Sequence, residues 1–230
     1  MFSASFSFSK IKVKPMIDLI KISSSEIDIS PEAVAVYLGY YSAKVDDFTA
    51  KLIEECTDEF LNAANFTACY SSIPVTDGEI VLNGHSIVCN SLKKNLNGCE
   101  KAYILAATTG IEAHRLIKRN SVISPLKGIV TDCVGSAAIE AFCDKINLSF
   151  ENPDFLRPRF SPGYGDMPLE CQKTIVDFLQ TNKTIGISLT ESLMMIPIKS
   201  VTAIIGIGKE KRKCTGSDCM TCSRTRCPYR

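Results

Sequence analysis

The longest helical pattern in the sequence is its strongest constraint on the fold. It runs from Pro125 to Ile146, and the small residues Gly135-Ser136-Ala137-Ala138 near its middle allow another backbone to pack closely. The run from Ala102 to Thr108 is short and almost continuously apolar, as is typical of a core strand. The sequence therefore predicts a long helix and at least one buried strand.

The remaining patterns alternate between helical and extended without a regular β-α-β order or an internal repeat. Helices are expected at residues 31–38, 46–63, 87–96, 111–119 and 168–179. Extended runs are expected within residues 10–22 and at 67–75, 79–82, 185–189 and 196–207, with a hairpin turn at Thr76-Asp77-Gly78. This order predicts an α+β fold with a largely antiparallel sheet flanked by helices. We expect one domain over residues 1–208 and a separate tail over 209–230.

Composition excludes several classes of function. A net charge of +1 over 230 residues gives no field that would attract nucleic acid or an anionic membrane. No apolar run is long enough to span a bilayer, and the N-terminus lacks a secretory pattern, so a cytoplasmic protein is expected.

Both His85 and His114 are predicted to be exposed rather than catalytic. Seven isolated cysteines are expected to be buried small hydrophobes: Cys56, Cys69, Cys89, Cys99, Cys133, Cys143 and Cys171.

The loop from Arg159 to Asp166 concentrates chemistry between two helical patterns. Pro162 fixes the backbone, while Gly163 and Gly165 permit positive φ or the close approach of a ligand. A guanidinium, an aromatic hydroxyl and a carboxylate surround this bend. The simpler alternative is a Pro-Gly turn in which Arg159 is solvated or pairs with Asp154 or Asp166.

The sequence of this loop resembles a motif of a known protein family. Arg159-Phe160-Ser161-Pro162-Gly163-Tyr164 is similar to the R-x-x-x-G-Y motif of the activation domain of vitamin-B12-dependent methionine synthase. Ala138 to Phe142 resembles that family's helix with a ligand-facing Glu, and Leu189 to Val201 resembles its L-T-E-S…P…S-V segment. The resemblance is best from about Ala102 to Ile207. It implies a curved antiparallel sheet flanked by helices, with S-adenosylmethionine (SAM) on the inner surface.

The resemblance also implies roles for five residues. Arg159 would pair with the carboxylate of SAM, and Glu140 would accept from its ribose hydroxyls or its ammonium group. Ser161 and Gly163 would bind the adenine edge through backbone groups, and Tyr164 would stack on or hydrogen-bond the nucleoside. From the residues alone, Glu140 could equally be an exposed helical carboxylate and Tyr164 an ordinary tyrosine at the edge of the core.

The tail contains four cysteines with the spacing C-x4-C-x2-C-x4-C: Cys214, Cys219, Cys222 and Cys227. Four thiolates this close together can hold one tetrahedral zinc ion or an iron–sulfur cluster. Binding of no metal is the third alternative. The spacing predicts a metal site without fixing the metal.

The resemblance implies a SAM-binding activation subunit for a cobalamin-dependent methionine synthase. Such a subunit would support reductive methylation of cob(II)alamin on a corrinoid-binding partner, with a flavodoxin or ferredoxin as a candidate electron donor. No cobalamin-binding motif is present in this chain, so cobalamin is expected only through the partner. Alternatives are a non-catalytic SAM-sensing or docking module with a structural metal tail, and a reactivator of another corrinoid methyltransferase. Whether the chain should be called an enzyme is left open.

Overall fold

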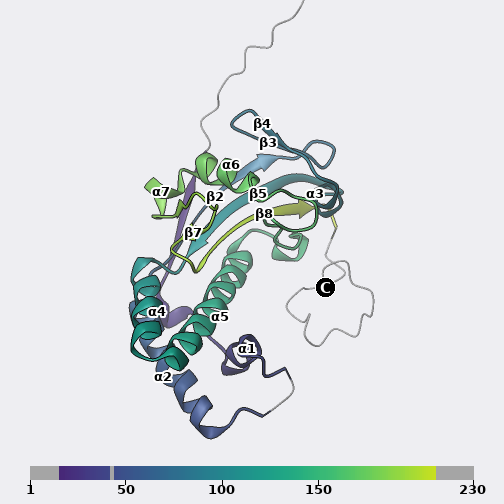
Figure 1. Ribbon diagram of the computed structural model, residues 1–230. Coiled ribbons are helices and arrows are strands. Elements are labelled where there is room, and N and C mark those ends of the chain that lie inside the picture. Colours follow the sequence, from purple (N-terminus) through teal and green to yellow (C-terminus); the bar gives the residue numbers. More distant parts are fainter. Residues whose placement is uncertain (1–15, 42–43, 211–230) are drawn as a thin grey trace, which may run out of the picture.

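The centre of the protein is a four-stranded sheet in which every neighbouring pair of strands is antiparallel. The computed structural model describes residues 16–41 and 44–210. The strand order is β1-β2-β5-β8 (Figure 1). The strands are β1 (Asp18–Ile22), β2 (Phe66–Pro74), β5 (Cys99–Thr108) and β8 (Ser200–Gly208). The predicted α+β fold with a largely antiparallel sheet is confirmed.

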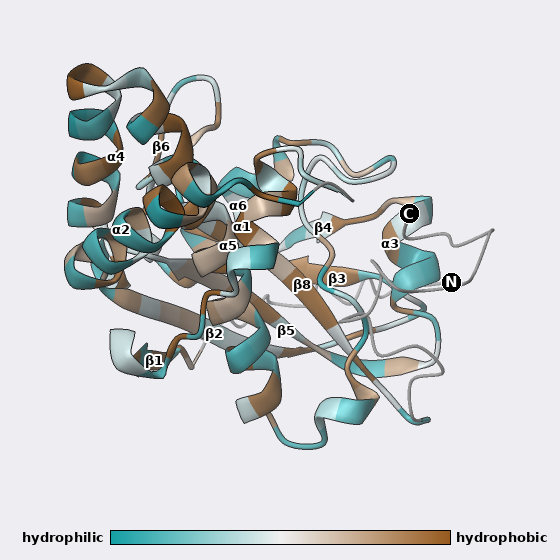
Figure 2. Cartoon of the chain, turned by 90° about the horizontal axis from the view of Figure 1, so that it is seen from below, coloured by the Kyte–Doolittle hydropathy of each residue, from teal (hydrophilic) through white to brown (hydrophobic). Residues whose placement is uncertain are grey.

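Both faces of this sheet are apolar, which explains the nearly continuous hydrophobic runs in β5 and β8. Successive strand residues point to opposite faces. Leu105 and Ala107 pack into one hydrophobic cluster, while Ile104 and Ala106 pack into the other. Figure 2 shows the resulting hydrophobic stretch along β8. The sheet therefore separates two cores.

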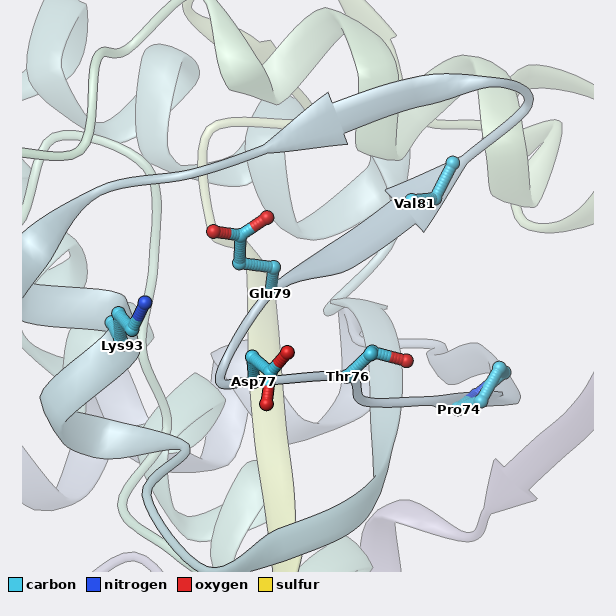
Figure 3. A pocket seen from close by; sticks show the side chains of 6 residues that line it. All are labelled: Pro74, Thr76, Asp77, Glu79, Val81 and Lys93. Carbon is cyan, nitrogen blue, oxygen red and sulfur yellow. The ribbon is translucent and has the colours of Figure 1, made fainter.

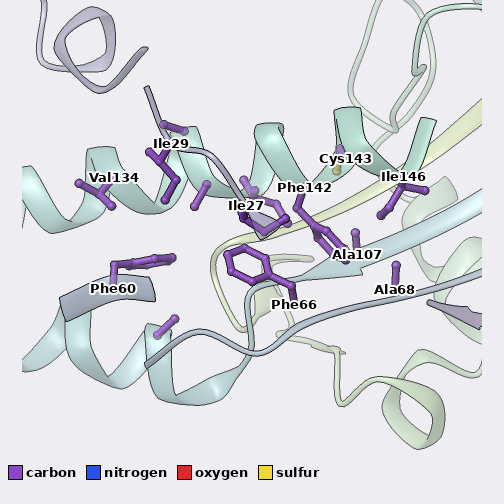
Figure 4. Close-up of a cluster of buried hydrophobic side chains, with 14 of the residues drawn as sticks. Ile27, Ile29, Phe60, Phe66, Ala68, Ala107, Val134, Phe142, Cys143 and Ile146 are labelled. Carbon is purple, nitrogen blue, oxygen red and sulfur yellow. The ribbon is translucent and has the colours of Figure 1, made fainter. Parts of the chain in front are cut away.

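Four helices cover the first face of the sheet (Figure 1). They are α1 (Pro31–Tyr37), α2 (Asp47–Ala63), α4 (Ile111–Ile123) and α5 (Pro125–Ser149). Ser30 and Asp46 cap α1 and α2 by accepting hydrogen bonds from the backbone N–H groups of Ala33 and Thr49. The core beneath α5 contains Phe66 and Phe142, whose rings meet edge to face (Figure 4). The long helix predicted from Pro125 is thus the main cover of this face.

Smaller elements cover the second face. They are α3 (Asn90–Asn95), α6 (Cys171–Leu179), α7 (Thr181–Thr184), the hairpin of β3 (Ile80–Leu82) and β4 (His85–Ile87), and the pair β6 (Ser188–Leu189) and β7 (Met195–Ile196). Short 3-10 turns occur at η1 (Ser24–Glu26) and η2 (Pro153–Phe155). Ile175 and Leu179 of α6 are fully buried in this second core.

Several predicted elements on the second face were wrong in type or partner. The Asp77-Gly78 turn exists, but a single bridge from Thr76 to Glu79 is all that joins its flanks, and β3 pairs with β4 instead. That hairpin turns at Asn83-Gly84, both with positive φ. The helix predicted at 87–96 is confirmed as the shorter helix α3, and only its first residue, Ile87, belongs to β4 instead. The run 185–189 joins β7 rather than the main sheet, and α6 begins at Cys171 rather than at Pro168.

One predicted exposure was also wrong. His114 is buried, and its Nδ1 accepts a hydrogen bond from the N–H of Ile198 at 3.3 Å. Burial lowers the pKa of His114, as do the charges of Lys118 and Arg115.

The isolated cysteines largely follow the prediction. Five of the seven are buried, whereas Cys133 and Cys171 are partly exposed. Burial raises the pKa of Cys69 to about 11 and that of Cys143 to about 12, so both are neutral thiols at physiological pH. Within residues 16–41 and 44–210, no helix has the length and apolar character needed to cross a membrane.

Candidate functional site

Arg159 lies on a segment that runs along the outer edge of β8. After α5 ends, the chain returns to the sheet, where bridges join Leu156 to Ile207 and Phe160 to Ile204. The N–H of Phe160 donates to the carbonyl of Ile204 at 2.9 Å, and the reverse bond measures 2.8 Å. These bonds cover the sheet edge and fix the backbone on which Arg159 is carried.

The guanidinium of Arg159 reaches α5 and pairs with two carboxylates on that helix. Its Nη2 lies 2.6 Å from Oε2 of Glu140, and its Nη1 lies 2.7 Å from Oδ1 of Asp144. Glu140 and Asp144 are four residues apart, so they share one face of α5. Burial alone would lower the pKa of Arg159, but attraction to its negatively charged neighbours outweighs burial and raises it. Arg159 is therefore a permanently charged, mostly buried cation, with a side chain 19% exposed.

The loop after Arg159 is tightly ordered by its own backbone. Gly163 and Gly165 both have positive φ, as the sequence suggested. The N–H of Gly163 donates to the carbonyl of Met167 at 3.0 Å, and the N–H of Tyr164 donates to the carbonyl of Ser161 at 3.1 Å. A Cβ on Gly165 would lie 2.4 Å from Oγ of Ser91, so only glycine fits against α3.

Asp166 ties this loop to α3. Its carboxylate accepts hydrogen bonds from the backbone N–H groups of Ser91 and Asn90, each 2.8 Å long. These bonds, led by that of Ser91, hold the pKa of Asp166 well below its usual range. Asp166 thus anchors the loop to the neighbouring helix, whereas the ion pairs of Arg159 run to Glu140 and Asp144.

Two tyrosines stand near the ion pairs. Tyr164 is 59% exposed, and its ring meets that of Phe160 edge to face, with centroids 6.2 Å apart. Tyr37, at the end of α1, is half exposed. Partial burial is the main cause that raises the pKa of Tyr37, and the negative charge of Glu140 is the second. The cluster therefore offers two accessible aromatic rings beside a guanidinium and two carboxylates. We call Arg159, Glu140, Asp144, Tyr164 and Tyr37 the arginine cluster.

The fold brings together residues that the sequence could name only separately. Arg159, Glu140 and Tyr164 meet in the arginine cluster, and Ser161 and Gly163 lie on the same loop. Asp144 was not predicted as a site residue, although its position one turn after Glu140 was a usable signal. Tyr37 could not have been found, because its place beside α5 depends on how α1 packs.

A separate hollow of about 460 Å³ lies beside the Asp77-Gly78 turn (Figure 3). It is lined by Pro74, Thr76, Asp77, Glu79, Val81 and Lys93, and none of these is a predicted site residue. Within the part of the chain that the structure describes, no group of three or more His, Cys, Asp or Glu side chains could hold a metal ion. The predicted metal ligands of the tail lie outside the described residues.

The fold is α+β, with an antiparallel sheet flanked by helices and Arg159 carried along the outer edge of that sheet. The family model described as "Vitamin B12 dependent methionine synthase, activation domain" matches residues 140–215, which include Glu140 and the loop of Arg159. A solved structure titled as the MetH reactivation domain bound to AdoHcy matches with a TM-score of 0.61 and 14% identity, over 88% of this chain and 81% of that chain. No curated protein matches in sequence.

These findings support the family resemblance that the sequence predicted. Residues 140–215 of the chain are similar to the vitamin-B12-dependent methionine synthase activation domain family. The architecture of the chain is that of the MetH reactivation domain.

Proposed function

We propose that this protein binds SAM at the arginine cluster and acts as an activation subunit for a cobalamin-dependent methionine synthase. The observation that carries the proposal is the meeting of Arg159 and Glu140 beside the exposed Tyr164, on the segment that the family model matches. The solved MetH reactivation domain with the same fold is bound to AdoHcy, the demethylated form of SAM.

The charges of the arginine cluster fit the amino-acid end of SAM. Its carboxylate would pair with the Arg159 fork, which offers parallel N–H donors in a fixed plane. Its ammonium group would donate hydrogen bonds to the carboxylate of Glu140, whose side chain is 46% exposed. Both ends of the zwitterion would thus find an opposite charge within one cluster.

The loop would hold the nucleoside end. Tyr164 presents an aromatic face for the adenine or the ribose. The Gly163 N–H and the Ser161 carbonyl already take part in hydrogen bonds within the loop. A carbonyl oxygen has two lone pairs, so the Ser161 carbonyl could still accept a second hydrogen bond from the ligand. We propose that Ser161 and Gly163 contact the adenine edge through their remaining backbone groups.

The chain itself would contribute binding and orientation rather than acid–base chemistry. SAM supplies the methyl group for reductive methylation of the cobalt, which belongs to a corrinoid-bearing partner subunit. Arg159, Glu140 and Tyr164 would fix the amino acid and the nucleoside so that the donor faces that partner. A flavodoxin or a ferredoxin would supply the electron.

The four cysteines of the tail, Cys214, Cys219, Cys222 and Cys227, are proposed to bind zinc or an iron–sulfur cluster. Visible absorbance of protein purified without oxygen distinguishes a cluster from zinc. Substitution of Cys219 by Ser should remove the metal without weakening SAM binding.

The test of the SAM site is a calorimetric titration of SAM into the intact protein, Arg159→Ala and Arg157→Ala. Arg157 is a matched control on the same segment, because its Nη2 donates to the carbonyl of Asn97 at 3.1 Å, away from the arginine cluster. Loss of a charge-assisted hydrogen-bonded pair should weaken binding by about 1.5–3 kcal/mol, roughly 10- to 150-fold, in Arg159→Ala alone. Equal affinities for the folded Arg159 and Arg157 variants would reject the site.

The role as an activator has its own test. Methylcobalamin should form when the protein, SAM and a reductant are added to a corrinoid-bearing methionine synthase subunit, and should not form with Arg159→Ala. Tight SAM binding without methylcobalamin formation would favour the SAM-sensing module instead.

A further inference from the structure

The guanidinium of Arg159 is already engaged by carboxylates of its own chain. Nη2 binds Glu140 and Nη1 binds Asp144, at 2.6 and 2.7 Å. A ligand carboxylate that binds the N–H of Nη1 now occupied by Asp144 must therefore displace the Asp144 carboxylate. The structure shows which carboxylate is easier to release.

Asp144 is the more accessible of the two carboxylates. Its side chain is 60% exposed, against 46% for Glu140 and 19% for Arg159. An exposed carboxylate regains water when it leaves a cation, so the net free energy of such a pair is small. Glu140 would keep Nη2 in place while Asp144 moves, so that the arginine need not be repositioned.

We propose that Asp144 is an internal competitor for the ligand's carboxylate, an inference that rests on the proposed SAM site. In the free protein Asp144 occupies Nη1 of Arg159 and holds the fork in its binding orientation. When the ligand arrives, its carboxylate replaces that of Asp144, which turns toward solvent. Asp144 thereby lowers affinity and sets the concentration at which the site fills.

A purely structural role for Asp144 predicts the opposite result. If Asp144 only anchored the Arg159 segment to α5, its removal would loosen the site and weaken binding. A competitor, by contrast, strengthens binding when it is removed. The sign of the change in affinity separates the two roles.

The variant Asp144→Asn keeps the size of the side chain and removes its charge. The matched control is Asp132→Asn, because Asp132 lies on the same helix and pairs with Lys199 at 2.9 Å. AdoHcy is the better probe, since it carries the same amino-acid carboxylate without the sulfonium charge. AdoHcy has no net charge, so the loss of a nearby negative charge weakens its binding less than it weakens that of SAM.

Calorimetric titration should show AdoHcy binding about two- to fivefold tighter in Asp144→Asn than in the intact protein, as expected for release of an exposed ion pair. Asp132→Asn should bind as the intact protein does. Thermal unfolding of both variants should show that they are folded and that they have lost similar stability.

The other possible results also test the competitor role of Asp144. Unchanged or weaker binding in Asp144→Asn, when the intact protein binds, overturns the competitor role and leaves the SAM site standing. Binding by Asp144→Asn alone supports the competitor role in its strongest form. Failure of every folded variant to bind AdoHcy or SAM overturns the proposed site together with the competitor.

Discussion

Two basic side chains reach helix α5 from the segments beside it, and they differ in what surrounds them. Lys199 pairs with Asp132 at 2.9 Å and donates to Oγ of Ser136 at 2.9 Å, while Arg159 pairs with Glu140 and Asp144. Both cations are largely buried, with side chains 13% and 19% exposed. We call Lys199, Asp132, Ser136 and Gly135 the lysine cluster.

The surroundings assign different roles to the two clusters. The stem of Lys199, the residue before β8, packs with Phe60 around Gly135, so the lysine cluster joins the start of β8 to α5. The arginine cluster instead includes the exposed Tyr164, which lies on a loop with two positive-φ glycines. A buried ion pair alone is therefore no evidence for a ligand site, and it is the exposed aromatic loop that distinguishes Arg159.

The largest expected effect comes from exchanging the two cations. Arg159→Lys keeps the charge but loses the planar fork, so SAM affinity should fall at least about tenfold. Lys199→Arg should leave SAM affinity within about twofold, because that cation only needs to remain paired. Calorimetric titration measures both, and equal losses would remove the distinction between the clusters.

A smaller effect is expected from Gly135→Ala, which acts on the lysine cluster alone. The new Cβ would lie 2.9 Å from Cγ of Lys199 and 3.0 Å from Cε2 of Phe60. Overpacking of this kind costs about 1–3 kcal/mol, against a gain in helix propensity of about 1 kcal/mol, so urea denaturation should show a net loss near 1 kcal/mol. SAM affinity should not change, and increased stability would show that α5 can move away from Lys199.

The smallest effect concerns two cysteines on α5, one at each cluster. Cys133 is partly exposed beside Asp132 and Lys199, whereas Cys143 is fully buried next to Arg159. A neutral thiol reagent at pH 8 should label Cys133 slowly and leave Cys143 unmodified in the native protein, as peptide mass spectrometry would reveal. Ready labelling of Cys143 would mean that the core beneath the arginine cluster opens frequently.

The sequence predicted the main sheet and the long helix because their signals are local. The apolar run at Ala102 and the Pro125 helix start each specify an element through their own residues. The region between Asp77 and Asn95 was predicted less well, because Asp-Gly and Asn-Gly are both good turns and only tertiary packing decides which strands pair. His114 illustrates the same limit, since its burial depends on Ile198, far along the chain.

The candidate site was predictable in its parts but not in its arrangement. The motif resemblance named Arg159, Glu140 and Tyr164, and each can be found in the sequence without a structure. That Arg159 pairs with Glu140 follows only from the return of the chain along β8, and the position of Tyr37 only from the packing of α1. Resemblance supplied the residues, and the fold supplied their contacts.

The most direct test of the central claim is a map of backbone amide NMR shifts during titration with SAM. The account predicts the largest changes at residues 140–144 and 159–165, and small changes at Asp132, Ser136 and Lys199. Changes concentrated at the lysine cluster, or at the hollow beside Asp77, would contradict it.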